Sequence, residues 1–169
     1  MLVSHDGKSI KFSEKDIRLT GRDTQGVRGI LLKKEDFVVG MEIAPHRLEE
    51  PKDKRKKFFK DILVVMENGV GKRTDIAEFP LQKRGGMGVK VAEVTPKTGK
   101  VICSQAVDEE VELVVLTSKQ AQVIKLPLKN IPRLGRATQG VILMRLDKSS
   151  SDGVSAVACL RKETESLTP

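Results

Sequence analysis

The sequence contains no tryptophan and no tyrosine, and its aromatic side chains are five phenylalanines. Proteins that bind single-stranded nucleic acid usually stack bases on several exposed aromatic rings. This chain has few rings to offer, so we expect any contact with nucleic acid to be made through the phosphates. The absence of tyrosine also excludes an enzyme that uses a tyrosine side chain as its nucleophile.

Cysteines and long apolar runs are also scarce. Cys103 and Cys159 each lie in an apolar segment, with no CxxC spacing and no neighbouring histidine, which favours buried reduced thiols over a metal site or a disulfide. No apolar run approaches the ~20 residues of a membrane helix, and the N-terminus does not resemble a signal peptide. We therefore expect a soluble cytoplasmic protein with no membrane partner, no metal and no cofactor.

Catalytic motifs are absent as well. The sequence has no GxxxxGK[ST] loop for ATP. Its two histidines, His5 and His46, are far apart and are typical of surface residues. No Ser-His-Asp arrangement is indicated, so we expect no catalytic residue in this chain.

Positive charge is in excess. The 169 residues include 31 lysines and arginines against 23 acidic residues, which gives a net charge of +8. A chain of this length can form a sizeable core. The basic excess favours a polyanionic partner, such as nucleic acid or an anionic membrane surface.

An internal repeat is the main signal. The segment 21–27, Gly-Arg-Asp-Thr-Gln-Gly-Val, recurs at 135–141 as Gly-Arg-Ala-Thr-Gln-Gly-Val, identical at six of seven positions. A looser copy, Arg-Gly-Gly-Met-Gly-Val, occupies 84–89. When the copies are aligned on their Gly-Val pair, they lie 62 and then 52 residues apart. The chain is therefore an array of three repeats.

The alignment creates columns of like residues. One column holds an arginine in every copy: Arg22, Arg84 and Arg136. The position fifteen residues before the aligned glycine is always basic: Lys11, Arg73 and Lys125. The position nine residues before it is always apolar: Ile17, Phe79 and Ile131. We interpret the two basic columns as phosphate-binding positions; the alternative is a solvated basic face with structural turn glycines.

Each repeat predicts four short strands separated by turns such as Asp6-Gly7 and Asn68-Gly69. The third repeat has strands at 113–116, 122–126, 141–146 and 154–160; the second at 62–66, 70–73, 89–94 and 101–107; the first at 2–3, 9–12, 27–32 and 37–43. Four-stranded units in series indicate an all-β, propeller-like array of blades. Three blades leave two sheet edges open, so we expect a fragment or self-association through those edges.

These patterns predict the domain limits. We expect a blade at 1–44 with an incomplete first strand, a basic linker at 45–61, a blade at 62–107, a blade at 108–160 and a disordered tail at 161–169. The segment 51–60 holds six basic residues. It is either an extra DNA-contacting arm or a solvated linker, and we favour the linker.

The segment 82–88, Gln-Lys-Arg-Gly-Gly-Met-Gly, resembles the gyrase box, the Gln-basic-Arg-Gly-Gly-basic-Gly signature of gyrase A subunits. The surrounding repeats resemble the blades of the C-terminal β-pinwheel found in those subunits, and a related domain occurs in topoisomerase IV. Two features depart from the family pattern. The box lies in the middle blade of three, and its sixth position is Met87 where the family has a basic residue. The chain thus resembles the last three blades of a pinwheel.

The resemblance implies a non-catalytic accessory module of a type IIA topoisomerase that binds, bends and wraps duplex DNA around a basic rim. It also implies nucleoid association, and partners in a gyrase B-like subunit and in the rest of the gyrase A subunit. The expected DNA-binding residues are Lys11, Arg22, Lys72, Arg73, Gln82, Lys83, Arg84, Gly85, Gly86, Lys125, Arg133 and Arg136. The alternatives are a protein-interaction propeller with no DNA role, which predicts exposed aromatic residues, and an RNA-binding β module.

Overall fold

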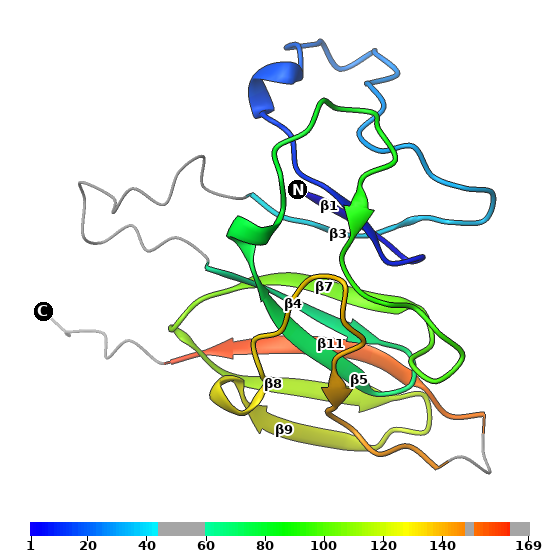
Figure 1. Cartoon of the computed structure of the whole chain (residues 1–169), viewed down its shortest axis with the longest axis vertical. Coiled ribbons are helices and arrows are strands. Elements are labelled where there is room, and N and C mark those ends of the chain that lie inside the picture. The colour runs from blue at the N-terminus through cyan, green and yellow to red at the C-terminus, as the bar shows by residue number, and fades with distance from the viewer. Residues whose placement is uncertain (44–59, 148–150, 163–169) are drawn as a thin grey trace, which may run out of the picture.

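The computed structural model describes residues 1–43, 60–147 and 151–162 (Figure 1). The described residues form β-strands and three single-turn 3-10 helices, which confirms the all-β prediction. The strands are β1 (Leu2–Ser4), β2 (Lys8–Ile10), β3 (Val38–Met41), β4 (Asp61–Met66), β5 (Val70–Asp75), β6 (Val89–Lys90), β7 (Val101–Val107), β8 (Val111–Ser118), β9 (Val123–Pro127), β10 (Val141–Ile142) and β11 (Val154–Arg161). The 3-10 helices are η1 (Glu14–Asp16), η2 (Ile76–Glu78) and η3 (Leu128–Asn130), one in each repeat.

The strands form three antiparallel sheets that follow one another along the long axis of the molecule (Figure 1). The strand orders are β3-β1-β2-β6, β10-β5-β4-β7 and β11-β8-β9. Strand β7 of the middle sheet contacts β3 on one side and β11 on the other. The predicted basic linker lies outside the described residues except for Lys60 and Asp61, and Asp61 already belongs to β4. The predicted tail likewise lies outside them beyond residue 162.

The sheets do not follow the repeat boundaries. Strand β6, expected in the second blade, pairs with β2 of the first sheet through Ser9 and Val89. Strand β10, expected in the third blade, pairs with β5 of the second sheet through Gly71 and Val141. The prediction that each repeat forms its own blade is therefore wrong in this respect, because the third strand of each later repeat crosses to the preceding sheet.

The first repeat has no strand at the predicted segment 27–32, and the third sheet has three strands instead of four. Both differences follow from the same exchange of strands. Within the described ranges no sheet precedes the first repeat, so its segment has no edge to join. Equally, no described segment joins the outer edge of β9.

The hairpin turns align in one column. Gly7 and Gly69 connect their strand pairs with φ of 76° and 75°, as the Asp-Gly and Asn-Gly turns predicted. The third repeat has Ala121 at this position, with φ of 62°. This φ is unfavourable for a residue that carries a β-carbon. The third turn therefore has the same backbone geometry as the other two, although its alanine is strained in it.

The core lies on both sides of β4, whose six residues are all buried. Successive side chains of a strand point to opposite faces. Ile62, Val64 and Met66 pack towards the first sheet, while Leu63 and Val65 pack towards the third. Strand β4 is apolar without alternation from Ile62 to Met66 because the middle sheet is covered on both faces.

The apolar column separates the first repeat from the others. Phe79 and Ile131 are 1% and 0% exposed, whereas Ile17 is 46% exposed. Phe79 belongs to the core between the first two sheets and Ile131 to the core between the last two. The first repeat thus carries a core-type residue with no neighbouring sheet to cover it in the described part of the chain.

Candidate nucleic-acid interface

Three loops with equivalent residues precede the exchanged strand of each repeat. We call them the first, second and third hook loops, at residues 21–27, 83–89 and 135–141. In each loop the glycine before the last residue has a positive φ: 74° for Gly26, 69° for Gly88 and 93° for Gly140. Glycine adopts this conformation without strain, which explains why it recurs where the loop turns into the next segment.

The second and third hook loops are fixed to the preceding sheet. The amide of Gln82 donates to the carbonyl of Lys11 at 2.8 Å, and the amide of Leu134 donates to the carbonyl of Arg73 at 2.8 Å. At the aligned glycines Gly88 and Gly140 the loop backbone lies very close to the backbone of the preceding sheet. A β-carbon on Gly88 would lie 2.2 Å from the carbonyl oxygen of Ser9. These loops are therefore held by backbone contacts in a defined position.

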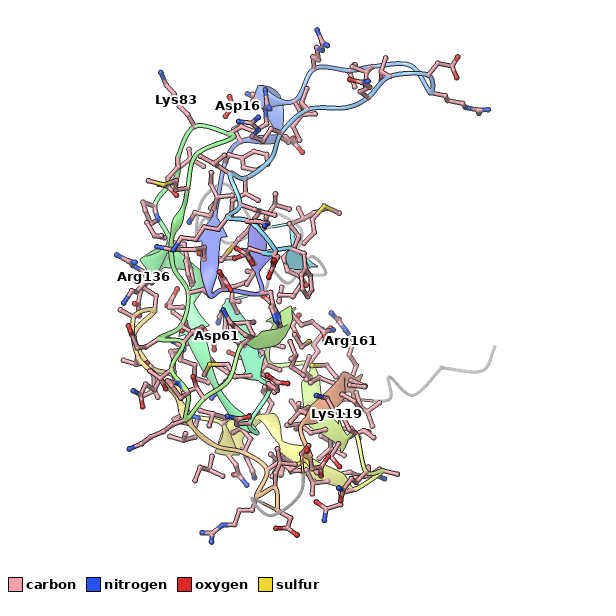
Figure 2. All side chains as sticks on the ribbon, turned by 90° about the vertical axis from the view of Figure 1, so that its right-hand side faces the viewer. Asp16, Asp61, Lys83, Lys119, Arg136 and Arg161 are labelled. Atoms are coloured by element: carbon pink, nitrogen blue, oxygen red, sulfur yellow. The ribbon has the colours of Figure 1, made fainter. Side chains whose placement is uncertain are left out.

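The second and third hook loops lie along one long edge of the molecule. Figure 2 places Lys83 and Arg136, from the second and third hook loops, on the same edge, and Lys119 and Arg161 on the opposite one. Lys83 is exposed. The repeat therefore presents basic side chains at successive positions along this edge.

The arginine column makes equivalent contacts between consecutive hook loops. Arg84 donates to the carbonyl of Arg28, two residues after Gly26, and also to the carbonyl of Asp16. Arg136 donates to the carbonyl of Lys90, two residues after Gly88, at 3.3 Å. Both arginines are only partly exposed. They join neighbouring hook loops while part of each guanidinium still faces solvent.

Arg22 differs from its two counterparts. Its side chain is exposed, and no hydrogen bond from its guanidinium occurs within the described ranges. Arg22 occupies the same position in its loop as Arg84 and Arg136 do in theirs. The described residues contain no earlier hook loop that it could contact.

Lys72 is not a surface residue, which contradicts its predicted role as a phosphate contact. It is 0% exposed, and its ammonium donates to the carbonyls of Gly135 and Arg136 at 2.6 and 2.9 Å. A third bond, of 3.2 Å, joins it to the hydroxyl of Thr138. Burial lowers the pKa of Lys72 to about 8. Its charge is used to hold the third hook loop on β5.

The second basic column also has internal partners. The ammonium of Lys11 donates to the carbonyl of Ile76 at 3.0 Å, and burial lowers its pKa. Arg73 donates to the carbonyl of Ile131 at 2.8 Å and pairs with Asp61 at 3.4 Å. Both cations tie one repeat to the next, so part of their hydrogen-bonding capacity is used within the protein.

Some residues of the box-like segment 82–88 are bonded or buried within the protein, and others are exposed to solvent. Gln82 is half-buried, and its side-chain oxygen Oε1 is buried with no partner in the described structure. The amide of Gly85 donates to the carbonyl of Gly29 at 2.8 Å, so it is not free for a phosphate. Gly86 is exposed and Met87 is 71% exposed. Met87 thus leaves an apolar side chain where the family has a cation.

Two further predicted residues lie outside the hook loops. Lys125 is exposed on β9. The side chain of Arg133 is half exposed but pairs with the buried carboxylate of Asp61 at 2.8 Å. Asp75 lies 3.8 Å from the same guanidinium. Lys125 is free to meet a polyanion, whereas Arg133 is largely neutralised by its acidic neighbours.

Sequence reasoning missed Arg28 and Lys90, which are both exposed. Each lies two residues after its aligned glycine, so the same alignment could have shown a position that is basic in the first two repeats, although the third repeat has Ile142 there. Lys90 also forms an ion pair with Glu93, which leaves Arg28 as the less encumbered of the two.

The described residues give little support for a reactive thiol, a metal site or a membrane helix. Cys103 and Cys159 are free and partly buried, and burial raises the pKa of each thiol to about 11. The portion of the chain described here contains no cluster of His, Cys, Asp or Glu suited to a metal ion. No helix among these residues has the length and apolar character needed to cross a membrane. A cleft of about 500 Å³ beside Asp61 and Arg73 carries both signs of charge in its lining.

The three repeats match a known family. The model of the DNA gyrase C-terminal domain, a beta-propeller, matches residues 1–45, 60–102 and 112–161. The chain belongs to this DNA gyrase C-terminal domain family. The match confirms the resemblance first seen in the segment 82–88. The family is an accessory region of gyrase rather than its catalytic core.

Curated relatives give the same result. The chain is 40% identical over 158 residues to the DNA gyrase A subunit of Staphylococcus epidermidis, covering 92% of this chain and 16% of the relative. It is 37% identical over 159 residues to the DNA gyrase A subunit of Staphylococcus aureus, covering 94% of this chain and 16% of the relative. The chain therefore spans about a sixth of the length of these gyrase proteins.

Solved structures agree on the fold. A DNA gyrase A C-terminal domain superposes with a TM-score of 0.71 at 27% identity, over 94% of this chain and 49% of that domain. The C-terminal domain of DNA topoisomerase IV superposes with a TM-score of 0.78 at 20% identity, over 95% of this chain and 46% of that domain. The propeller architecture is thus common to this chain and both domains.

Proposed function

We propose that this chain is a non-catalytic module that binds duplex DNA through its phosphates and bends or wraps it, as part of a type IIA topoisomerase. The main support is the repetition of hook loops that carry basic residues, with Lys83 and Arg136 of the second and third loops on the same edge (Figure 2). The proposed contacts are Arg22, Arg28, Lys83, Arg84, Lys90, Lys125 and Arg136, with Arg133 in a lesser role because of its acidic partners. Lys72 is excluded by its burial. Lys11, Arg73, Gln82 and Gly85 act in support of the loops, with Gly86 at their surface.

Phosphate binding suits this arrangement. Contacts with phosphates fix the position of a duplex and need no base-specific code. Bending 20–30 base pairs by 40–90° takes roughly 1–6 kcal/mol, and hydrogen bonds to charged groups contribute about 1.5–3 kcal/mol each. Several hook loops acting together can therefore offset the bending energy over this whole range, whereas a single such bond offsets only its lower part.

The intact enzyme provides the setting for this proposal. The chain would act beside a gyrase B-like subunit, with the remainder of a gyrase A subunit, in the cytoplasm and at the nucleoid. Its three sheets would correspond to the last three blades of a pinwheel. The 37–40% identity to gyrase A subunits over most of the chain supports this assignment.

The binding test measures the affinity for a short fluorescent duplex by anisotropy over a range of salt concentrations. Each neutralised phosphate contributes about −0.9 to the slope of log K against log salt. We expect a steep slope, weaker binding to single strands and RNA, and little dependence on base sequence. A slope of log K against log salt near zero would contradict the proposal and favour a protein-interaction module.

A matched pair of variants tests the edge that binds. Lys83 and Lys119 are both exposed but lie on opposite edges (Figure 2). Lys83→Gln should lower the duplex affinity several-fold and reduce the salt slope by about one unit. Lys119→Gln removes the same charge and should leave both unchanged. Equal losses in the two variants would show that net charge, rather than the hook-loop edge, governs binding.

A further inference from the structure

Two carboxylates lie against the third hook loop and the residues beside it. Glu78, the last residue of η2, accepts a hydrogen bond from the amide of Arg136 at 2.9 Å. Glu93 pairs with the ammonium of Lys90 at 2.5 Å, and its own amide donates to the carbonyl of Thr138 at 3.1 Å. Each carboxylate therefore contacts a residue that the proposed function assigns to DNA phosphates.

The two cations of this region also lie together. The guanidinium of Arg136 donates to the carbonyl of Lys90 at 3.3 Å, which brings the end of the second hook loop to the third. Two acidic and two basic side chains thus share one small area, and their formal charges cancel. Carboxylate and phosphate oxygens accept hydrogen bonds from the same donors. A phosphate that approaches this area must therefore compete with groups of the protein itself.

Glu78 occupies a position that suits an anion. Its Oε2 atom would lie 3.7 Å from a β-carbon placed on Gly135, so the carboxylate lies directly against the loop backbone. Burial lowers the pKa of Lys72, and the negative charge of Glu78 partly opposes this shift. An amide donor and a nearby ammonium are the features by which a protein loop attracts a phosphate. The side chain of Glu78 already satisfies both.

The second hook loop has no such carboxylate on its amide. Asp16 occupies the position aligned with Glu78, and its side chain is one methylene shorter. Its backbone carbonyl, not its carboxylate, accepts from the guanidinium of Arg84 at 3.2 Å. Within the described ranges no hydrogen bond is made by the amide of Arg84, the counterpart of the Arg136 amide that Glu78 occupies.

The position of Glu93 differs between the two loops in the same way. Leu31 is aligned with Glu93, and its amide donates to the carbonyl of Gly86 at 2.9 Å. This bond is the equivalent of the one from Glu93 to Thr138. The backbone beside each loop is therefore the same, but an apolar side chain stands beside the second loop and an acidic one beside the third.

We propose that Glu78 and Glu93 set the DNA affinity of the third hook loop by competing with phosphates, so that the second hook loop binds the duplex more tightly than the third. This inference rests on the proposed function and names residues that oppose it. A phosphate gains Lys90 only by displacing the carboxylate of Glu93. If the two acids instead served only to position the loop and its cations, their removal would weaken DNA binding. The two explanations thus predict changes of opposite sign.

The chain contains a closely matched control for Glu93. On the opposite edge Glu67 pairs with Lys119 at 3.1 Å, with side chains 38% and 54% exposed (Figure 2). Glu93 and Lys90 are 36% and 49% exposed. Glu93→Gln and Glu67→Gln therefore remove the same charge from similar ion pairs on different edges. Glu93→Gln should tighten duplex binding about two- to fivefold, whereas Glu67→Gln should bind as the wild type does.

The salt dependence gives an independent measurement. Freeing Lys90 allows one more phosphate to be neutralised, so Glu93→Gln should make the slope of log K against log salt steeper by up to about 0.9. Glu67→Gln should leave the slope unchanged. Fluorescence anisotropy on one short duplex measures the affinity and the slope in both variants, and circular dichroism establishes that each is folded.

The possible failures can be told apart. A wild-type slope near zero would refute the proposed function, and this inference with it. A wild-type chain that binds DNA, with equal gains in Glu93→Gln and Glu67→Gln, would show that net charge alone acts and would overturn only the inference. Unchanged or weaker binding in Glu93→Gln would overturn it as well, because the carboxylate would then merely position Lys90.

Glu78→Gln tests the second carboxylate. Glutamine keeps the length of the side chain and an oxygen that accepts from the amide of Arg136, while the charge is removed. We expect the same two- to fivefold gain in affinity as for an exposed ion pair of about this strength. A loss of affinity without a change in Tm would assign Glu78 a purely positioning role and contradict the proposal for this residue.

A reciprocal variant keeps the proposal testable if Glu93→Gln does not fold. Leu31→Glu places a carboxylate beside the second hook loop, at the position that Glu93 has beside the third. It should weaken duplex binding about two- to fivefold relative to Leu31→Gln, which has the same shape without the charge. Equal affinities of Leu31→Glu and Leu31→Gln would show that a carboxylate at this position does not compete with DNA.

Discussion

Arg136 donates a hydrogen bond to the carbonyl oxygen of Lys90 at 3.3 Å, and this bond joins the third hook loop to the second. Arg84 makes the equivalent bond to Arg28 one repeat earlier. One arginine in each of the second and third repeats therefore connects its hook loop to the residues that follow the preceding one. The loops are spaced by protein contacts before any DNA arrives, which limits the ordering that binding requires.

The arginine column allows a test that separates stability from binding. Arg136→Ala should lower the free energy of unfolding by about 1 kcal/mol, because a hydrogen bond between loops is lost. It should also weaken duplex binding. Arg22→Ala should weaken binding alone, since Arg22 has no described partner. Urea unfolding and anisotropy measure the two quantities, and a similar loss of stability in Arg22→Ala would contradict the prediction.

The aligned glycines provide a second matched pair. Gly26→Ala places a side chain at φ of 74° in open space, so we expect a loss of about 1 kcal/mol from backbone strain alone. Gly88→Ala adds a severe contact with the carbonyl of Ser9 and should cost more than about 2 kcal/mol. Thermal unfolding measures both. Equal losses would mean that the second hook loop is not held as described.

The turn column predicts opposite effects of opposite changes. Ala121 has φ of 62°, so Ala121→Gly should stabilise the protein by about 0.5–1 kcal/mol through release of strain. Gly69→Ala, at the same position one repeat earlier, should destabilise it, because the new β-carbon would lie 2.2 Å from the carbonyl oxygen of Met144. A change of the same sign in both variants, measured by urea unfolding, would refute this explanation.

Removing the buried cation should weaken the fold at neutral pH. Lys72→Met keeps much of the side-chain volume but leaves two carbonyls and a hydroxyl without their donor. We expect a loss of about 1–3 kcal/mol at pH 7, as for other unsatisfied buried groups. Urea unfolding measures the loss, and an unchanged midpoint would show that the ammonium contributes nothing net.

The same lysine gives a pH dependence of defined sign. Its pKa is about 8 in the folded chain, below the ordinary value of 10.5. Between these values the unfolded chain binds a proton that the folded chain lacks, so the stability from this group rises with pH. The stability of the wild type relative to Lys72→Met should therefore increase from pH 7 to 10, by no more than about 3 kcal/mol. A difference that falls over this range would be inconsistent with the lowered pKa.

DNA bending by the isolated chain should be modest. The energy of bending grows with the imposed angle, while the phosphate contacts are limited to the hook loops of three repeats. Ligation of short linear duplexes into circles, with and without protein, reports the bend. Strong enhancement at concentrations where sedimentation shows only monomer would refute this prediction.

Much of the fold could be predicted because the repeat fixes equivalent positions. Alignment on Gly26, Gly88 and Gly140 found the hook loops, and the Asp6-Gly7 and Asn68-Gly69 turns located the hairpins. The exchange of strands between sheets could not be predicted in this way. Strands β6 and β10 have two residues each, and so short a segment carries no pattern that tells one sheet edge from another.

The interior role of Lys72 was missed because lysine is rarely buried. A signal was nevertheless available, since the aligned residues are Ile10 and Ile124. A lone lysine in an apolar column indicates a core position with a buried cation. The internal partners of Lys11 and Arg73 were missed for a different reason: their acceptors are backbone carbonyls in the next repeat, and a sequence column does not show carbonyls.

The donation of β6 and β10 to the sheet before them gives the array a polarity. Each repeat completes its predecessor and depends on its successor, so the stability of any one sheet is set by the residues that follow it. A repeat could be duplicated within the array without disturbing this relation, because every new junction would again join a loop to the preceding edge. A deletion that begins inside one hook loop and ends at the same point of the next would preserve it equally well. Such an architecture can change its number of blades by whole repeats, because each junction again joins one hook loop to one sheet edge.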